Sequence, residues 1–206
     1  MMRALLASGA AGILLSGCTS VETAADPQRE FAKAIASRCG KAYAGRMVSN
    51  EAADEDMAGK AMVMHVTSCD PARLTVPFHV GPGGSSDKWD RSRTWVITQT
   101  DAGLRLKHDH RHEDGSADAV TYYGGDTASK GTAMRQEFPV DAESIALFKA
   151  NGLDRSVTNI WAVEISDKIF AYELRRPAGP NARYFRVEFD LTKPIAAPPP
   201  AWGWEN

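Results

Sequence analysis

The feature that most constrains the fold is a pair of apolar stretches late in the chain, residues 157–166 and 169–176. Large apolar side chains alternate with other residues in both stretches, which is typical of strands with one buried face. A two-residue loop, Asp167-Lys168, would join the two strands into a hairpin. This register places six large apolar residues on one face, as the pairs Ile165 with Phe170, Val163 with Tyr172 and Trp161 with Leu174. The two stretches therefore predict an antiparallel sheet that covers a core.

The rest of the chain continues this pattern. Further strands are predicted at residues 40–48, 60–68, 73–80, 93–100, 118–123, 133–138 and 184–191, and one more in a histidine-rich segment. Residues 124–126, Gly-Gly-Asp, are typical of a turn that ends one of these strands. Helices do not alternate with the strands, which argues against a parallel sheet. We therefore expect an all-β, mainly antiparallel fold of about ten strands with two short helices. A lipocalin-like barrel or strongly curved sheet is the preferred form, because closure removes exposed edges, and a two-sheet sandwich is the alternative.

Both expected helices begin at an aspartate. Asp26 precedes a proline, which is typical of the first position of a helix, and residues 27–38 carry an apolar stripe. Asp141 is expected to cap the second helix, and Gly152 to end it.

The histidine-rich segment, residues 103–115, reads GLRLKHDHRHEDG and holds three of the five histidines. Residues two apart in a strand share a face. A strand here would place the following residues on one side: Leu104, Leu106, His108, His110 and His112. The leucines belong against a core, whereas the histidines make the end of the same face polar. We therefore expect this strand to approach the open end of a barrel or curved sheet.

These histidines are the best candidates for a functional site, and strand geometry limits their chemistry. Residues i and i+4 of a strand lie about 13 Å apart. Zinc holds its nitrogen ligands at about 2.0–2.1 Å, so one ion cannot bind all three. A His-x-His pair would need a third ligand from another strand, for which His79 and His65 are the candidates. Asp126 is a candidate partner of the histidines. No carboxylate is clearly placed as a general base, though Glu113 is close in sequence. The alternative is a hydrated polar rim.

The first residues have the pattern of an export signal. Arg3 supplies a positive charge, and residues 4–15 are apolar but too few to span a bilayer. The sequence Leu-Ser-Gly-Cys that ends at Cys18 resembles the lipobox of bacterial lipoproteins. This resemblance implies cleavage before Cys18, a diacylglycerol on its sulfur and usually an acylated amino group, which together hold a protein on a membrane. Thr19 favours the outer membrane, with the protein facing the periplasm.

Two further cysteines, Cys39 and Cys69, remain after Cys18 is set aside. An exported chain with an even number of remaining cysteines favours a disulfide, and two buried free thiols are the alternative. If Cys39 lies opposite Cys69 in an antiparallel register, Tyr43 lies opposite His65.

The domain organisation follows from these features. The expected parts are a signal peptide (1–17), a lipidated tether (18–25), a single β domain (26–191) and a Pro- and Ala-rich tail (192–206). Trp202 and Trp204 of that tail are candidates for docking back onto the domain.

Composition narrows the function. The net charge of −2 provides no strong field for nucleic acid, so no nucleic-acid partner is expected. The body resembles uncharacterised exported bacterial proteins that share a KHDHRHEDG-like run, a resemblance that implies no activity. We expect a non-enzymatic envelope protein without a cofactor, anchored to the membrane by its lipid. It would bind a small or apolar ligand, or another envelope protein, with Trp161, Phe170 and Tyr172 lining the interior.

The alternative function is a zinc-type metal site on the histidine-rich strand, used for metal binding alone or for hydrolysis. Its ligands would come from His108, His110 and His112, with His79 as the partner from another strand.

Overall fold

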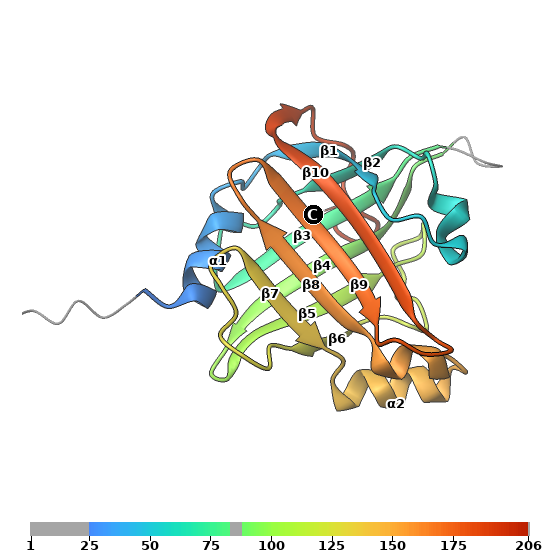
Figure 1. The fold of residues 1–206 in the computed structure, drawn as a ribbon. Coiled ribbons are helices and arrows are strands. Elements are labelled where there is room, and N and C mark those ends of the chain that lie inside the picture. Colours follow the sequence, from blue (N-terminus) through green and yellow to red (C-terminus); the bar gives the residue numbers. More distant parts are fainter. Residues whose placement is uncertain (1–24, 83–87, 206) are drawn as a thin grey trace, which may run out of the picture.

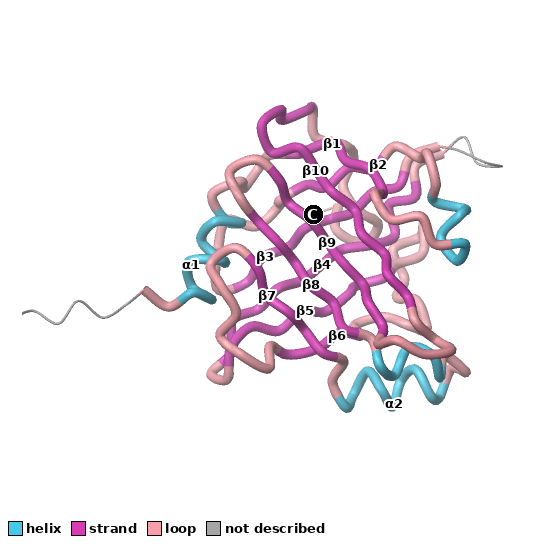
Figure 2. Tube along the Cα trace, in the orientation of Figure 1, coloured by secondary structure: helices cyan, strands magenta, loops and turns pink. Residues whose placement is uncertain are grey.

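The computed structural model describes residues 25–82 and 88–205, in which ten antiparallel strands form one sheet that curls into a nearly closed barrel (Figure 1). Strands make up almost the whole wall, and the two α-helices lie outside it (Figure 2). The predicted all-β antiparallel barrel is confirmed, and the sandwich alternative is wrong. The strands are β1 (Ala42–Met47), β2 (Met62–His65), β3 (Arg73–Val80), β4 (Asp90–Thr100), β5 (Gly103–His110), β6 (Tyr123–Asp126), β7 (Arg135–Pro139), β8 (Ile160–Ile165), β9 (Ile169–Arg176) and β10 (Arg183–Ile195).

The strand order follows the chain around the barrel. The sheet runs β6-β5-β4-β3-β2-β1-β10-β9-β8-β7, so each strand pairs with its neighbour in sequence and β1 pairs with β10. Only β6 and β7 are joined incompletely, through a bridge between Gly125 and Val140 and a hydrogen bond from the Asp141 N–H to the Gly124 carbonyl (3.0 Å).

Two glycines allow β6 to lie close to β5 on one side and to the end of β7, at this seam, on the other. A Cβ on Gly124 would lie 1.8 Å from the Leu106 carbonyl oxygen, and a Cβ on Gly125 would lie 1.8 Å from the Pro139 carbonyl oxygen. The turn predicted at residues 124–126 is therefore wrong, because these residues form most of β6. The strand predicted at 118–123 is also wrong, since residues 118–122 form the loop that leads into β6.

The helices begin where the sequence predicts. The Asp26 side chain accepts the Gln28 N–H (2.9 Å) at the start of α1 (Pro27–Ala36), and the Asp141 side chain accepts the Ser144 N–H (2.8 Å) at the start of α2 (Ala142–Ala150). Figure 1 shows α1 at one end of the barrel and the short 3-10 helix η1 (Ala52–Met57) at the other. A second 3-10 helix, η2 (Asp154–Thr158), follows α2. No helix in the described ranges is long and apolar enough to cross a bilayer.

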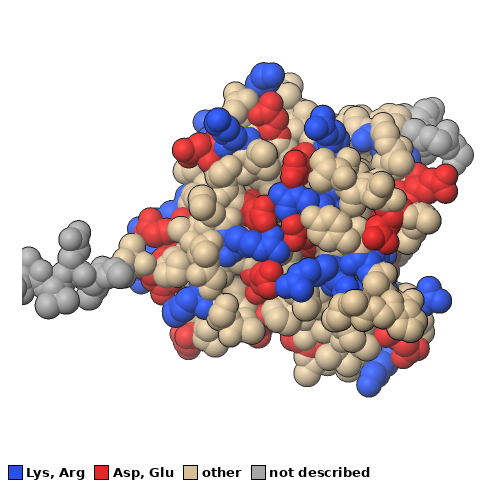
Figure 3. Space-filling model, in the orientation of Figure 1, with Lys and Arg blue, Asp and Glu red and all other residues tan. Residues whose placement is uncertain are grey.

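The β8–β9 hairpin has the predicted register, with Ile165 opposite Phe170 and the other two apolar pairs in step. Its inner face lies in the core. Its outer face, together with β7 and β10, carries alternating charges (Figure 3). Arg135 and Arg186 each form ion pairs with both Glu164 and Glu173. The charges of this outer face are therefore largely paired with one another.

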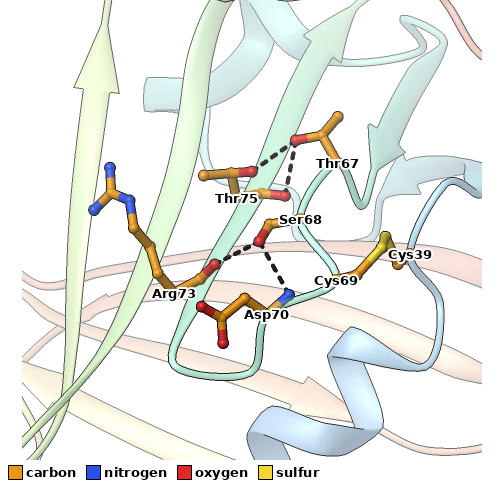
Figure 4. Close-up of a disulfide and its surroundings, with 7 residues drawn as sticks. All are labelled: Cys39, Thr67, Ser68, Cys69, Asp70, Arg73 and Thr75. Atoms are coloured by element: carbon orange, nitrogen blue, oxygen red, sulfur yellow. Dashed lines mark hydrogen bonds between the residues drawn. A yellow bond between two sulfur atoms is a disulfide. The ribbon is translucent and has the colours of Figure 1, made fainter.

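The predicted disulfide between Cys39 and Cys69 is confirmed, with the two Cα atoms 5.0 Å apart (Figure 4). It ties the residues that follow α1 to the loop between β2 and β3. The predicted register is wrong by one residue, because Tyr43 lies opposite Met64 rather than His65. The cysteines themselves lie outside the strands, so their pairing does not fix the strand register. The observed register places Tyr43 and Met64 together in the core.

The tail packs against the barrel. β10 continues past residue 191 to Ile195, which pairs with Ala42, so the predicted domain boundary falls inside a strand. Beyond it, the Trp202 N–H donates to the Arg91 carbonyl (3.1 Å), and Trp204 Nε1 donates to Asp109 Oδ2 (2.8 Å).

Candidate functional site

The histidine-rich strand is β5, and only part of its predicted face forms. Leu104, Leu106 and His108 point into the core, and His110 follows them at the end of the strand. His112 lies beyond β5 and is exposed, with its backbone N–H bound to the Ser116 carbonyl (2.9 Å). The prediction that all three histidines share one strand face is therefore wrong for His112. The chain leaves the strand at His110, because residues 112–116 make a tight hydrogen-bonded turn.

The structure does not bring His79 to His108 or His110. Phe78 points into the barrel and stacks on Trp95 (ring centroids 4.9 Å apart), so alternation along β3 turns His79 to the outer side. His65 is also on the outer side, since Met64 before it lies in the core. The zinc set predicted from His108, His110 and His79 is therefore wrong. Within the described ranges, no three His, Cys, Asp or Glu side chains are arranged to hold a metal ion.

The two predicted acidic partners are also elsewhere. Asp126 forms an ion pair with Arg105 (2.6 Å), and Glu113 is exposed in the turn after β5.

His108 and His110 instead line a cavity of about 120 Å³ at the end of the barrel near η1. Strands far apart in the sequence supply its walls, and η1 contributes Asp54 and Met57. The other lining residues are Phe78, Arg93, Trp95, Tyr123, Tyr172, Leu174, Arg183 and Phe185.

A row of hydrogen bonds runs from Tyr172 to His108, then to the backbone carbonyl of Tyr123, whose hydroxyl bonds to His110. Tyr172 Oη lies 2.7 Å from His108 Nε2, and His108 Nδ1 lies 3.1 Å from the Tyr123 carbonyl oxygen. Because a carbonyl can only accept, His108 carries its proton on Nδ1 and accepts the Tyr172 hydroxyl at Nε2. The Tyr123 hydroxyl lies 3.0 Å from His110 Nε2. This row fixes the orientation of all four side chains.

Burial keeps this row neutral near neutral pH. It lowers the pKa of His108 to about 3, with a further contribution from His110, and that of His110 to about 4, with Arg93 contributing. Burial also raises the pKa of Tyr123 to about 12. The row therefore offers neutral hydrogen-bonding groups rather than charges.

The charged side of the cavity is made by Asp54 and Arg183, which form an ion pair. Asp54 is only 2% exposed, and burial raises its pKa despite the opposing effect of Arg183. Asp54 Oδ2 and Arg183 Nε are buried and have no hydrogen-bond partner among the described residues. Arg93, the other arginine of the lining, forms an ion pair with Asp90. The ion pair in the cavity wall therefore leaves one buried acceptor atom and one buried donor atom without a partner among the described residues.

The aromatic side is built around Trp95, which stacks on Tyr172 with ring centroids 4.4 Å apart. All three residues predicted to line the interior lie inside the barrel, but only Tyr172 lines this cavity. Trp161 packs against His108 (5.0 Å) and Phe170 against Trp95 (6.0 Å), so both fill the core instead. Side chains occupy most of the barrel interior, which leaves a space near one end.

Sequence reasoning missed Asp54, Arg93 and Arg183. Asp54 lies in a segment whose acidic composition predicts a surface loop, and the arginines lie in strands whose alternation gives no sign of a ligand. Only the closed barrel brings residues 129 positions apart, Asp54 and Arg183, into contact.

Comparison of the chain with protein-family models, with curated proteins and with solved structures found no match.

Proposed function

We propose that this protein is a non-enzymatic binding module that holds a small, planar, polar molecule in the barrel-end cavity. The observation that carries the proposal is the buried ion pair of Asp54 and Arg183, whose remaining acceptor and donor atoms face no partner among the described residues. Buried polar atoms are normally satisfied, and leaving one unpaired costs about 1–3 kcal/mol. A ligand with one donor and one acceptor group would remove this cost.

The cavity also favours a ring. Trp95 and Tyr172 form a stacked aromatic wall, and Phe78 extends it. Aromatic groups in proteins prefer stacked or edge-on neighbours. The volume of about 120 Å³ is slightly below the roughly 150 Å³ of an engineered, closed cavity that takes benzene, but this cavity is open on one side, so the substituents of a ring can extend beyond it. The ligand class is therefore a single small ring rather than a lipid or a sugar chain.

The proposed setting is the cell envelope, with a lipid on Cys18 as the link to the membrane, outer rather than inner. The lipobox-like sequence supports this setting, although Cys18 lies outside the described residues. The Cys39–Cys69 disulfide supports it independently, because such bonds persist mainly in oxidising compartments. An envelope protein bound at the mouth of the barrel is the alternative partner, and the ligand search below discriminates between them.

The test is ligand-observed ¹⁹F NMR with 5-fluoro-2-pyridone, which carries a donor and an acceptor on one ring, and with fluorobenzene as the apolar control. We expect saturable binding of the pyridone and much weaker binding of fluorobenzene. Leu174→Trp should abolish binding, because Leu174 lines the cavity and the larger side chain fills it. Leu153→Trp is the matched control, since Leu153 is exposed and is not among the residues that line the cavity.

A second pair of variants tests the polar row. Tyr172→Phe removes the hydroxyl that His108 accepts and should weaken pyridone binding, whereas Tyr184→Phe removes a hydroxyl bound to Glu173 outside the cavity and should not. Equal binding of both probes, pyridone binding that survives Leu174→Trp, or no saturable binding of the pyridone would each contradict the proposal.

A further inference from the structure

A second cavity, of about 210 Å³, lies on the outer side of the barrel and is independent of the first. Val63 of β2 and His79 of β3 form its floor. Trp89 and Arg91 form one side, and the segment 195–199 at the end of β10 forms the other. The tail therefore covers part of the barrel wall without filling the space beneath it.

His79 is the unusual residue of this cavity. It is only 1% exposed, and neither ring nitrogen has a hydrogen-bond partner among the described residues. Burial, followed by the nearby Arg91 charge, lowers its pKa to about 4, so the ring is neutral at neutral pH. A neutral imidazole has one N–H donor and one acceptor nitrogen. The buried donor thus belongs to a residue that lines the cavity, and no described group accepts it.

Arg91 adds a charge to the same place. Its guanidinium donates to the Pro200 carbonyl, and no carboxylate of the described residues lies within ion-pair distance of it. The remaining walls are apolar, with Trp89 and Ile195 each partly exposed at the rim. One cation, one neutral donor and apolar walls complement an anion that has an apolar body.

We propose that this outer cavity is a binding site for a small monocarboxylate with an apolar body. The carboxylate would accept from Arg91 and from the N–H of His79, and the body would lie between Trp89 and the tail. The volume exceeds the roughly 150 Å³ that holds benzene, so a benzoate-sized anion fits. The same chemistry disfavours a metal cation, because Arg91 repels it.

The probe is 4-fluorobenzoate, observed by ¹⁹F NMR, and its neutral counterpart is 4-fluorobenzyl alcohol. We expect saturable binding of the benzoate and at least about tenfold weaker binding of the alcohol, because the alcohol lacks the charge-assisted hydrogen bond to Arg91. Arg91→Met should weaken benzoate binding by a similar factor, and His79→Phe should weaken it by a smaller factor, because it removes one hydrogen bond from a neutral donor.

The matched control is Arg73→Met. Arg73 is an exposed arginine on the same strand and face as His79, about 20 Å away at strand spacing, and its loss should leave binding unchanged. Leu174→Trp should also leave benzoate binding unchanged, because it alters only the barrel-end cavity. This separates failure of the outer site from failure of the proposed function.

Because Arg91→Met could also loosen the tail, the wild-type protein supplies an independent readout. Benzoate should shift the ¹⁵N resonances of the His79 ring, assigned by their absence in His79→Phe. No saturable binding, equal binding of the alcohol, unchanged affinity in both His79→Phe and Arg91→Met, or unmoved His79 resonances would each overturn the proposal, leaving a hydrated cavity.

Discussion

Loss of the Cys39–Cys69 disulfide should destabilise the barrel by an amount that depends on the number of residues in the loop that the bond closes. The two residues are 30 positions apart, and the bond restricts the unfolded chain across that loop. The chain-entropy relation gives a loss of about 12 cal/mol/K, or about 3.6 kcal/mol at 25 °C. For a protein of this size, this corresponds to a fall in Tm of about 7–15 °C.

The structure indicates which region responds first. The bond ties the residues after α1 to the loop between β2 and β3, and α1 places Phe31 and Ile35 in the core. Without the bond, α1 keeps its packing but loses its covalent link to the sheet. We therefore expect hydrogen exchange in α1 to accelerate more than exchange in β8 or β9.

The assay is urea unfolding of a Cys39→Ala/Cys69→Ala variant, followed by tryptophan fluorescence and far-UV circular dichroism. Cys18→Ser is included in all proteins, so that this thiol cannot form mixed disulfides. The reference protein should lose the same stability when a reductant is added, whereas the double alanine variant should not respond to reductant. A difference below about 1 kcal/mol would refute the loop-entropy reasoning.

Three further outcomes are expected. The free energy of unfolding should fall as pH drops from about 6.5 to about 4. The reason is that His108 and His110 have native pKa values near 3 and 4, whereas histidines of the unfolded chain bind protons already at about pH 6.5. A free energy of unfolding that stays constant between pH 7 and 5 would contradict this. Gly125→Ala should cost more than about 4 kcal/mol in chemical denaturation, because its Cβ would lie 1.8 Å from the Pro139 carbonyl oxygen; a well-folded variant would show that the seam can open cheaply. Intact-mass measurement of membrane-extracted protein should show acyl additions on an N-terminal Cys18, and an unmodified terminus at another residue would refute lipidation.

The sequence predicted the structure correctly where residues close together in the chain determine the local fold. The register of the β8–β9 hairpin follows from three apolar pairs and a two-residue loop, all within twenty residues, and the structure matches it. Both helix starts follow from an aspartate cap in the same local way.

The predictions that were wrong concern features that depend on contacts between distant segments of the chain. Gly124 and Gly125 form a strand because carbonyls of β5 and of residue 139 approach closely, a requirement set by distant segments. Local turn preference carries no information about that approach. The predicted zinc set placed His79 with His108 because both are histidines. Alternation along β3 turns His79 to the outer side of the barrel wall, whereas His108 lies on the inner side. The cavity residues Asp54 and Arg183 meet only because the barrel closes.

The pairing of β1 with β10 also bears on how the barrel folds. Eight of the strand pairings join neighbours along the chain, and each of these can form while later residues are still absent. The ring itself closes only when Ile195 meets Ala42, a separation of 153 residues. Such a distant contact carries a large entropy cost before it yields any packing, so closure should be the slow step. Until β10 arrives, the inner faces of β1 and β9 remain open to solvent or to any chaperone that holds the unfinished chain.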